Sequence, residues 1–449
     1  MNIPSDTRAR FQMHSQLMND CSSSSKNGET TSSKSAAFRH MFHEIDGCRA
    51  CGGTQIREVL AFGDMPLADG LRAHDELDEA EPHFPLTVDF CTDCSLMQIR
   101  ENVDTSLLFG TDYPYFSSFS DAWVSHCRDN ALELIERRKL NNESLVVELA
   151  CNDGYMLKHF KEKGVQVLGV DPAPGPAAAA REQGIEVLED FFTTQMADEL
   201  SSNGVKADVI IGNNVLAHVP DLPGFVKGIA TLLKEDGVAV IECPYVRDLI
   251  DHREFDTIYH EHHCYFSVTA LARLCTAQGL SLNDVRRLPT HGGSIRLFIE
   301  PQVNVSESVQ QLLAEEAELG MDTFDYYESF ADRVRSTQTQ LASLLKQLKS
   351  EGHKLAAYAA AAKGATLLNS MNIGSETLDY VVDRNRHKHG RYMPGTEVRV
   401  RDTSVLLEDK PDYVLMLAWN FKDEILKQQA EFRAQGGKFI VPIPQPEVV

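Results

Sequence analysis

Apolar residues gather in short runs from residue 145 onward, and helical stretches lie between most of these runs. Five of the runs predict buried parallel strands. They lie at 145–149, 166–170, 185–188, 209–212 and 238–242. A helix near 268–277 precedes two further predicted strands at 280–288 and 294–300. A parallel sheet closed by a hairpin predicts a doubly wound α/β domain.

A second α/β unit with a Rossmann-like pattern is predicted nearer the C-terminus. Its strands are expected at 355–359, 378–382, 413–417 and 439–442. Residues 304–350 are predicted to form a helical connector between the two units. We therefore expect residues 303–449 to form this connector and the C-terminal domain.

The part of the chain before residue 145 has a weaker pattern. Residues 1–40 are polar and Ser-rich, and we expect a disordered leader there. Residues 41–100 show little regular periodicity, whereas residues 101–140 predict helices. We expect a small N-terminal domain at 41–105 and the first α/β domain, with its preceding helices, at 106–302.

Composition narrows the possible classes of protein. The 449 residues are 43% hydrophobic and 24% charged, which is typical of a globular protein. A net charge of −23 argues against nucleic acid as a partner, and no apolar run is long enough to span a membrane. The N-terminus shows no apolar signal segment, and ten cysteines are too few for a disulfide scaffold. We expect a cytoplasmic monomer.

Four of the cysteines form two Cys-x-x-Cys pairs, Cys48 with Cys51 and Cys91 with Cys94. Two thiolates three residues apart can bind one ion from a tight turn, and two such pairs complete a tetrahedral shell that suits zinc. All four ligand positions are then sulfur, which leaves no open position for substrate. The sequence therefore predicts a structural zinc ion, and two unrelated pairs of reduced cysteines are the alternative.

The segment from Glu148 to Gly154 lies between the first predicted strand and a helix, where small residues let a ligand approach the backbone. The next strand ends in Asp171, whose carboxylate can bind ribose hydroxyls and would repel a phosphate. Glu148 suits a cationic amino group, Asp190 could contact an adenine amine, and Phe191 could stack on the ring. These features favour S-adenosylmethionine (SAM) over an ordinary strand–turn–helix. The predicted cofactor-binding residues are Glu148, Ala150, Asn152, Gly154, Asp171, Asp190, Phe191, Asn213 and Asn214.

Titratable residues follow the fourth and fifth predicted strands. His218 comes after the fourth strand, and the densest cluster in the chain, Tyr-His-Glu-His-His at 259–263, comes after the fifth. Binding sites of open α/β sheets lie at the carboxyl ends of strands, so both segments are expected beside the methyl donor. Tyrosine and histidine can both act as general bases. His291, next to two glycines, could line the same cleft.

Several segments, in their order and combination, resemble the three-domain SAM-dependent C-methyltransferases of deoxysugar biosynthesis. That family acts on nucleotide-linked 4-keto-6-deoxy sugars. The resemblance covers about residues 42–445. The matching segments are CRACGG with CTDC, ELACNDGY, GNNVLAHVPD, IYHEHHCYFS, HGGSIRLF, AAKG and DRNRHKHGRYMPGT.

The resemblance implies a zinc domain, a class I methyltransferase domain and a Rossmann-like C-terminal domain, with the sugar nucleotide in a cleft involving the last two. It assigns the core of a catalytic loop to Tyr259, Glu261 and His262, and active-site roles to His218 and Tyr113. One departure is Ala360, in a segment that usually contains a second glycine.

The expected reaction is C-methylation beside a sugar ketone through an enolate, without a catalytic metal. His262 is the expected base and Tyr259 the competing candidate, while Glu261 orients the loop. His218 or Tyr113 would bind the developing enolate oxygen. The alternatives are O- or N-methylation of another small molecule, and a non-catalytic SAM-binding module.

The second α/β unit is expected to bind the diphosphate of the acceptor. Lys363 and Gly364 follow its first predicted strand, where a helix N-terminus and a positive charge suit a diphosphate. Trp419 and Asn420 follow a later strand and could line the same cleft. With His291, these four residues are the predicted substrate-binding residues.

Overall fold

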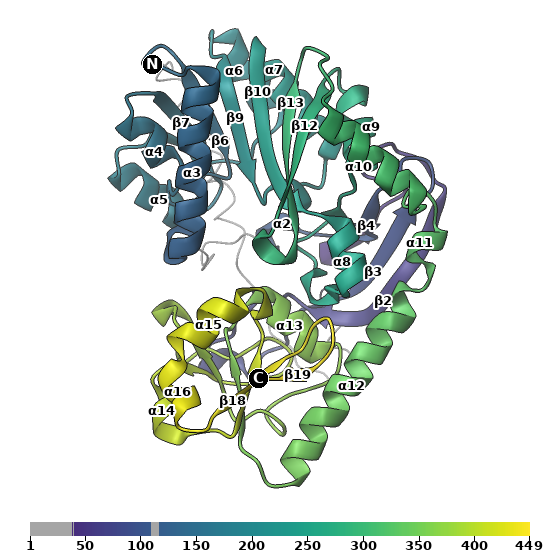
Figure 1. The fold of residues 1–449 in the computed structure, drawn as a ribbon, viewed down its shortest axis with the longest axis vertical. Helices are drawn as coiled ribbons and strands as arrows, with labels where there is room; N and C mark the ends of the chain where they lie inside the picture. Colours follow the sequence, from purple (N-terminus) through teal and green to yellow (C-terminus); the bar gives the residue numbers. More distant parts are fainter. Residues whose placement is uncertain (1–37, 39, 109–115) are drawn as a thin grey trace.

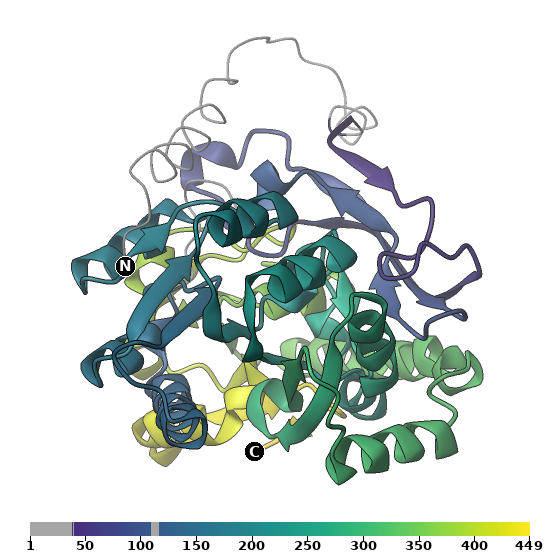
Figure 2. The ribbon, with the colours of Figure 1, turned by 90° about the horizontal axis from the view of Figure 1, so that it is seen from above.

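The computed structural model describes residue 38, residues 40–108 and residues 116–449. These residues form a two-stranded ribbon and sheets of seven, four and six strands. Figure 1 shows the seven-stranded sheet at the top and the six-stranded sheet at the bottom. The four-stranded N-terminal sheet, whose first three strands along the chain are purple, lies between them. Figure 2 shows these N-terminal strands running along one side of the molecule.

The seven-stranded sheet has the strand order β12-β13-β10-β9-β6-β7-β8. The bounds are β6 Leu145–Leu149, β7 Gln166–Val170, β8 Val187–Leu188, β9 Ala207–Asn213, β10 Leu233–Pro244, β12 Ser281–Leu288 and β13 Ser294–Glu300. Strands β6 to β10 are parallel, and β13 pairs antiparallel with both β10 and β12. This arrangement confirms the predicted doubly wound sheet of the class I methyltransferase type. Strands such as β6 and β9 are short and almost wholly buried, which is why continuous apolar runs predict where they lie.

The N-terminal sheet has the order β11-β4-β3-β2. The bounds are β2 Ile56–Pro66, β3 His83–Cys91, β4 Met97–Ile99 and β11 Cys264–Tyr265. Its long β2–β3 hairpin was not predicted, because register shifts at Glu58/Leu60 and Ala61/Gly63 break the alternation of apolar and polar residues. Strand β11 comes from the predicted catalytic loop, so that loop is part of the N-terminal sheet.

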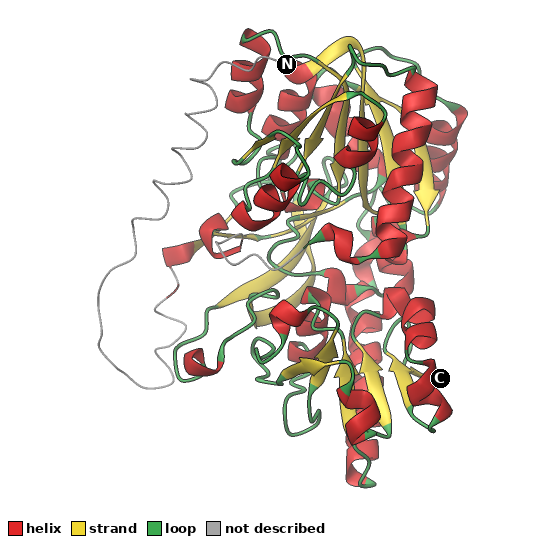
Figure 3. Cartoon of the chain, turned by 90° about the vertical axis from the view of Figure 1, so that its left-hand side faces the viewer, coloured by secondary structure: helices red, strands yellow, loops and turns green. Residues whose placement is uncertain are grey.

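The C-terminal sheet has the order β16-β15-β14-β17-β18-β19, in which β19 alone is antiparallel to its neighbour. The bounds are β14 Leu355–Tyr358, β15 Val381–Asp383, β16 Val400–Asp402, β17 Tyr413–Met416, β18 Lys438–Val441 and β19 Glu447–Val448. Figure 3 shows these strands side by side with helices around them. The Rossmann-like unit is therefore confirmed, with β16 and β19 as strands that the apolar runs did not reveal.

The predicted connector contains three helices, α10 Glu307–Glu318, α11 Asp325–Glu328 and α12 Phe330–Ser350. In α12 the buried residues recur every three to four positions, so one face packs while the charged face meets water. Figure 1 shows α12 running from the N-terminal sheet along the C-terminal sheet. The stretch 101–140, predicted to be helical, differs because β5 Glu101–Val103 pairs with β1 Phe42–Glu44 before the helices begin. Those helices are α2 Thr105–Leu108 and α3 Asp121–Arg138.

The remaining helices flank the two large sheets. They are α4 Leu157–Glu162, α5 Pro174–Glu182, α6 Thr194–Ser202, α7 Leu222–Leu232, α8 Val246–His252, α9 Val268–Ala277, α13 Ala362–Asn369, α14 Val405–Asp409, α15 Lys422–Gln428 and α16 Ala430–Ala434. No helix within the described ranges is long and apolar enough to cross a membrane.

Candidate active site and zinc centre

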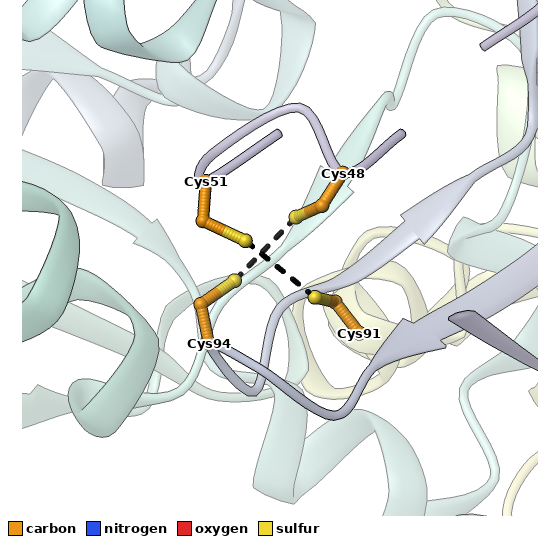
Figure 4. A group of neighbouring side chains, drawn as sticks. All are labelled: Cys48, Cys51, Cys91 and Cys94. Carbon is orange, nitrogen blue, oxygen red and sulfur yellow. Dashed lines mark hydrogen bonds between the residues drawn. The ribbon is translucent and has the colours of Figure 1, made fainter. Parts of the chain in front are cut away.

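The four predicted metal ligands come together in the N-terminal domain. Figure 4 shows their sulfur atoms pointing toward one another from two loops. Cys48 Sγ lies 3.4 Å from Cys94 Sγ, Cys51 Sγ lies 3.7 Å from Cys91 Sγ, and all four sulfurs lie within 4.8 Å of one another. Zinc–sulfur bonds of about 2.3 Å give a tetrahedron with edges of about 3.8 Å. The donor set and its spacing therefore fit zinc.

Each cysteine pair sits in a tight turn that shapes half of the site. Gly52 N donates to Cys48 O and Ser95 N donates to Cys91 O, both at 2.8 Å. Both Gly52 and Ser95 have positive φ, which closes the turn behind the second cysteine. The second pair leads directly into β4, so the metal centre is joined by a few residues to the strand that holds β11.

The predicted SAM site lies at the carboxyl ends of β6 and β7. Ala150, Asn152 and Gly154 have positive φ in the turn after β6. A Cβ atom at Gly154 would lie 2.4 Å from Ile185 Cδ1, so a side chain there would clash. The turn therefore folds tightly and leaves its backbone close to the end of the sheet.

Asp171 joins the two strand ends. Its Oδ2 accepts a hydrogen bond from Asn152 N at 2.8 Å, and its Oδ1 accepts one from Ala173 N at 2.9 Å. Burial raises the pKa of Asp171 to about 6, and its hydrogen bonds oppose the rise. The carboxylate thus shapes the turn where the sequence predicts ribose binding.

Glu148 and Asn213 lie deeper in the same site. Glu148 is fully buried, and burial raises its pKa well above the usual value. Asn213 Nδ2 donates to Tyr155 Oη at 3.3 Å, while its buried Oδ1 has no hydrogen-bond partner among the described residues. A buried acceptor and a buried carboxyl group suit the cationic amino group of SAM, so the residues present fit that cofactor.

The other predicted cofactor residues lie nearer the surface. Asp190 Oδ1 accepts from Phe191 N at 2.8 Å, and Phe191 is 39% exposed in the loop after β8. Asn214 has positive φ, and its Nδ2 lies 3.3 Å from His291 Nε2. Their contacts with the cofactor stay predictions.

We expect Asp171→Ala to weaken SAM binding about 10- to 150-fold, because a charge-assisted hydrogen bond to the ribose is lost. Isothermal titration with SAM measures the change. Asp383→Ala is a matched control, since Asp383 holds Ala360 N and Asn385 N in the same way at the C-terminal sheet. Unchanged SAM affinity in the Asp171 variant, or an equal loss in the control, would contradict this role.

The predicted catalytic loop contacts two sheets. Through β11, Cys264 pairs with Gln98 and Tyr265 with Met97 of the N-terminal sheet. His263 N also donates to Ala217 O at 2.7 Å, behind the end of β9. The sheet that carries the zinc ligands therefore holds this loop against the methyltransferase sheet. Nothing in the sequence indicates this role, because β11 is only two residues long.

Tyr259 and His262 form a stacked and hydrogen-bonded pair. Tyr259 Oη lies 3.0 Å from His262 Nε2, and His262 Nδ1 lies 2.8 Å from the carbonyl oxygen of Thr257. A carbonyl can only accept, so Nδ1 carries the proton and Nε2 of the neutral ring accepts from Tyr259. Burial lowers the pKa of His262 well below its usual value, and the neighbouring His218 and the Lys363 ammonium group lower it further. The His262 ring is therefore neutral in the free protein, and the lone pair at Nε2 faces the hydroxyl group of Tyr259.

His218 lies against this pair, with its ring centroid 4.7 Å from that of His262. Its Nδ1 donates to Glu261 O at 2.7 Å, and burial lowers its pKa to about 4. The neutral ring thus presents an acceptor at Nε2. Donating a hydrogen bond to an enolate oxygen would first require protonation of His218, which burial disfavours.

The Glu261 side chain points away from the two histidines. Its Oε1 accepts from Asp69 N at 3.5 Å, and Asp69 belongs to the loop after β2. Burial, with the Asp69 carboxylate in addition, raises the pKa of Glu261 to about 8, so this group is protonated at neutral pH. Such a contact suits a residue that orients the loop.

Lys363, Trp419 and Asn420 come together beyond the carboxyl ends of β14 and β17, the two central strands of the C-terminal sheet. Lys363 Nζ lies 4.0 Å from the centroid of the Trp419 ring and 3.2 Å from Asn420 Oδ1. Trp419 Nε1 donates to Asp256 Oδ2 at 2.7 Å, three residues before Tyr259. The sequence predicts that the first three residues lie together, but it gives no signal for Asp256, whose partner lies 163 residues away.

Two of the predicted substrate-binding residues, Gly364 and His291, make packing contacts within the protein. A Cβ atom at Gly364 would lie 2.9 Å from Leu417 Cβ, so close packing of α13 accounts for this glycine. The ring centroid of His291 lies 5.1 Å from that of Trp123 and 6.2 Å from that of Phe421, between the two large sheets. Tyr113 lies outside the described residues.

Three family models match successive parts of the chain. Residues 48–109 match the model described as "Putative zinc binding domain", residues 123–285 match "Methyltransferase domain", and residues 289–444 match "C-methyltransferase C-terminal domain". The matches follow the order that the sequence analysis expects.

Individual relatives differ in how much of the chain they cover. C-methyltransferase NovU of Streptomyces niveus is 35% identical over 408 residues, which cover 90% of this chain and 97% of the relative. The ubiquinone biosynthesis O-methyltransferase of Azorhizobium caulinodans is 26% identical over 122 residues, 27% of this chain and 47% of the relative. A solved SAM-dependent methyltransferase from Clostridium acetobutylicum is 15% identical, with a TM-score of 0.32, over 41% of this chain and 93% of that chain. The long match to NovU, with the three successive family models, shows that the chain belongs to the family of three-domain SAM-dependent C-methyltransferases.

Proposed function

We propose that this C-methyltransferase acts on a nucleotide-linked 4-keto-6-deoxysugar and methylates the carbon next to the ketone. The observation that carries the proposal is the position of Lys363. Lys363 lies on α13, beside the second Rossmann-like sheet, and its Nζ lies 4.0 Å from the centroid of the Trp419 ring. Trp419 Nε1 in turn donates to Asp256 Oδ2, three residues before Tyr259, so the ammonium group is held near the segment that carries the Tyr259–His262 pair. A cation beside a proton-accepting pair suits an acceptor with an anionic diphosphate and an acidic carbon.

In the proposed mechanism, Tyr259 and His262 act as a unit. The tyrosine oxygen takes the proton from the carbon next to the ketone while its own proton passes to His262 Nε2. His262 becomes an imidazolium that Thr257 O stabilises through Nδ1–H. The substrate becomes an enolate whose carbon is the nucleophile. When bound, SAM supplies the electrophilic methyl group that this carbon receives.

The proposal divides the work among three parts of the chain. Residues 41–105 bind zinc and brace the catalytic loop, residues 106–302 bind the methyl donor, and residues 303–449 bind the acceptor. Glu148, Asp171 and Asn213 face the donor side, whereas Lys363 and Asn420 face the acceptor side. Because the donor and acceptor sites use different sheets, mutations should weaken the two ligands separately.

Lys363→Ala should weaken the binding of a nucleoside diphosphate, with TDP among the nucleotides tested, by about tenfold or more, since a hydrogen bond to a charged group is lost. SAM affinity should stay within about twofold. Titration of each ligand by calorimetry measures both values. Lys346→Ala, on the exposed face of α12, is the matched control. Equal loss of both ligands, or loss of neither, would contradict the proposed acceptor site.

A further inference from the structure

Asp256 is a buried carboxyl group at the boundary between the catalytic loop and the C-terminal sheet. It lies in the 3-10 turn η6 Phe255–Thr257 and has no exposed surface. Its Oδ2 accepts the indole N–H of Trp419 at 2.7 Å, and Trp419 belongs to η9 Trp419–Phe421. The same indole ring lies under the Lys363 ammonium group. The Asp256 carboxylate therefore holds the Trp419 ring, which lies against the Lys363 ammonium group.

A second hydrogen bond joins the same segment of the loop to α13. Thr366 Oγ1, on α13, donates to Ile258 O at 3.0 Å in a buried environment. Ile258 directly precedes Tyr259, so both contacts act within three residues of the catalytic pair. These two hydrogen bonds therefore fix the position of the catalytic loop relative to the predicted acceptor site.

We propose that Asp256 is a positioning residue that, through Trp419, sets Lys363 against the Tyr259–His262 pair. The assignment of Lys363 to the acceptor rests on the proposed function, whereas the control of Trp419 by Asp256 does not. Asp256 makes this link without touching the reacting atoms. Its loss should misplace the acceptor and leave the methyl donor unaffected.

Electrostatics support the same role. Burial raises the pKa of Asp256 to about 6, while the charge of Lys363 and the Trp419 hydrogen bond oppose the rise. The charged groups that face Asp256 are Lys363 from α13 and Glu254 from its own segment. As pH falls through about 6, Asp256 takes up a proton and its hold on the indole N–H and on Lys363 weakens. Trp419 should therefore report this titration.

The chain has two tryptophans, Trp123 and Trp419, so Trp123→Phe leaves Trp419 as the one indole reporter. In this background we expect the fluorescence of Trp419 to change with a midpoint near pH 6. Asp256→Asn should abolish the change, because the amide keeps the shape and loses the titration. Persistence of the transition in Asp256→Asn would overturn the proposed link to Trp419.

Steady-state kinetics in the Trp123-containing protein test the consequence. Asp256→Asn should raise KM for the acceptor by about tenfold, the effect of losing a charge-assisted contact, with KM for SAM within about twofold. Trp419→Phe keeps an aromatic ring, although a smaller one, and removes the N–H donor, so it should raise acceptor KM similarly and without additivity to Asp256→Asn. Equal rises in both KM values, or additive effects, would overturn the positioning role.

The two proposals can fail separately. If Lys363→Ala leaves nucleoside diphosphate binding unchanged while Asp256→Asn still abolishes the Trp419 transition, the proposed acceptor site is wrong and the Asp256–Trp419 link stands. If Lys363→Ala weakens that binding and Asp256→Asn leaves both the transition and the acceptor KM unchanged, the positioning role is wrong and the proposed function stands.

Discussion

Tyr259→Phe should lower the turnover of C-methylation by about 10²- to 10⁴-fold, the usual contribution of a positioned general base. The phenylalanine keeps the ring stacked on His262 and removes the oxygen that would take the substrate proton. Affinities for SAM and for a nucleoside diphosphate should change little, because the substitution keeps the aromatic ring and leaves the predicted ligand-binding residues unchanged. Single-turnover kinetics with both ligands saturating measure the effect.

His262→Ala should cause a loss of similar size, because the tyrosine then has no nitrogen to receive its proton. The double variant should be little worse than either single variant, as expected for residues that act as a unit. Tyr392→Phe is a matched control, since Tyr392 Oη lies 3.2 Å from His74 Nδ1 in an exposed tyrosine–histidine pair. A His262→Ala protein that bound both ligands and kept wild-type turnover would exclude this pair as the base.

Zinc removal should have the second large effect. The purified protein should carry about one zinc ion per chain, and Cys91→Ser with Cys94→Ser should abolish that content. Structural zinc contributes about 10–16 kcal/mol to the folding of zinc-finger peptides near neutral pH, so the N-terminal sheet should lose its order without the metal. Because β4 holds β11, this loss should also release the catalytic loop and lower turnover.

Three measurements test these effects: zinc content by atomic spectroscopy, hydrogen exchange in β3, β4 and β11, and activity. Cys275→Ser is the control, because Cys275 is a buried free cysteine on α9, outside the cluster. Its zinc content and activity should stay close to wild type. A metal-free protein with full activity would show that the cluster has no structural role.

The sequence predicts well what depends on local pattern. Strand β6 was expected at residues 145–149 and lies there, because a strand buried on both faces is a continuous apolar run. The four cysteines could be assigned to one site because zinc chemistry fixes the number and type of ligands. Both inferences use residues close together in the chain or a strict chemical rule.

Long-range contacts could not be predicted in this way. Two residues, Cys264 and Tyr265, are too few to show a strand pattern, and their partner strand lies more than 160 residues earlier. Asp256 and Trp419 meet because two domains pack together, and nothing in the sequence around either residue indicates the other as its partner. The proton position on His262 depends on Thr257 O, a backbone contact that spacing does not reveal.

The position of the transferred methyl group tests the central claim most directly. The protein is incubated with SAM that carries a ¹³C-labelled methyl group and with a nucleotide-linked 4-keto-6-deoxysugar, and the product is examined by carbon–proton NMR. The proposed function predicts that the labelled methyl is bonded to the ring carbon next to the ketone, and that the proton on that carbon has been lost. A labelled methyl bonded to oxygen or nitrogen, or the absence of label from every 4-keto sugar nucleotide tested, would contradict it.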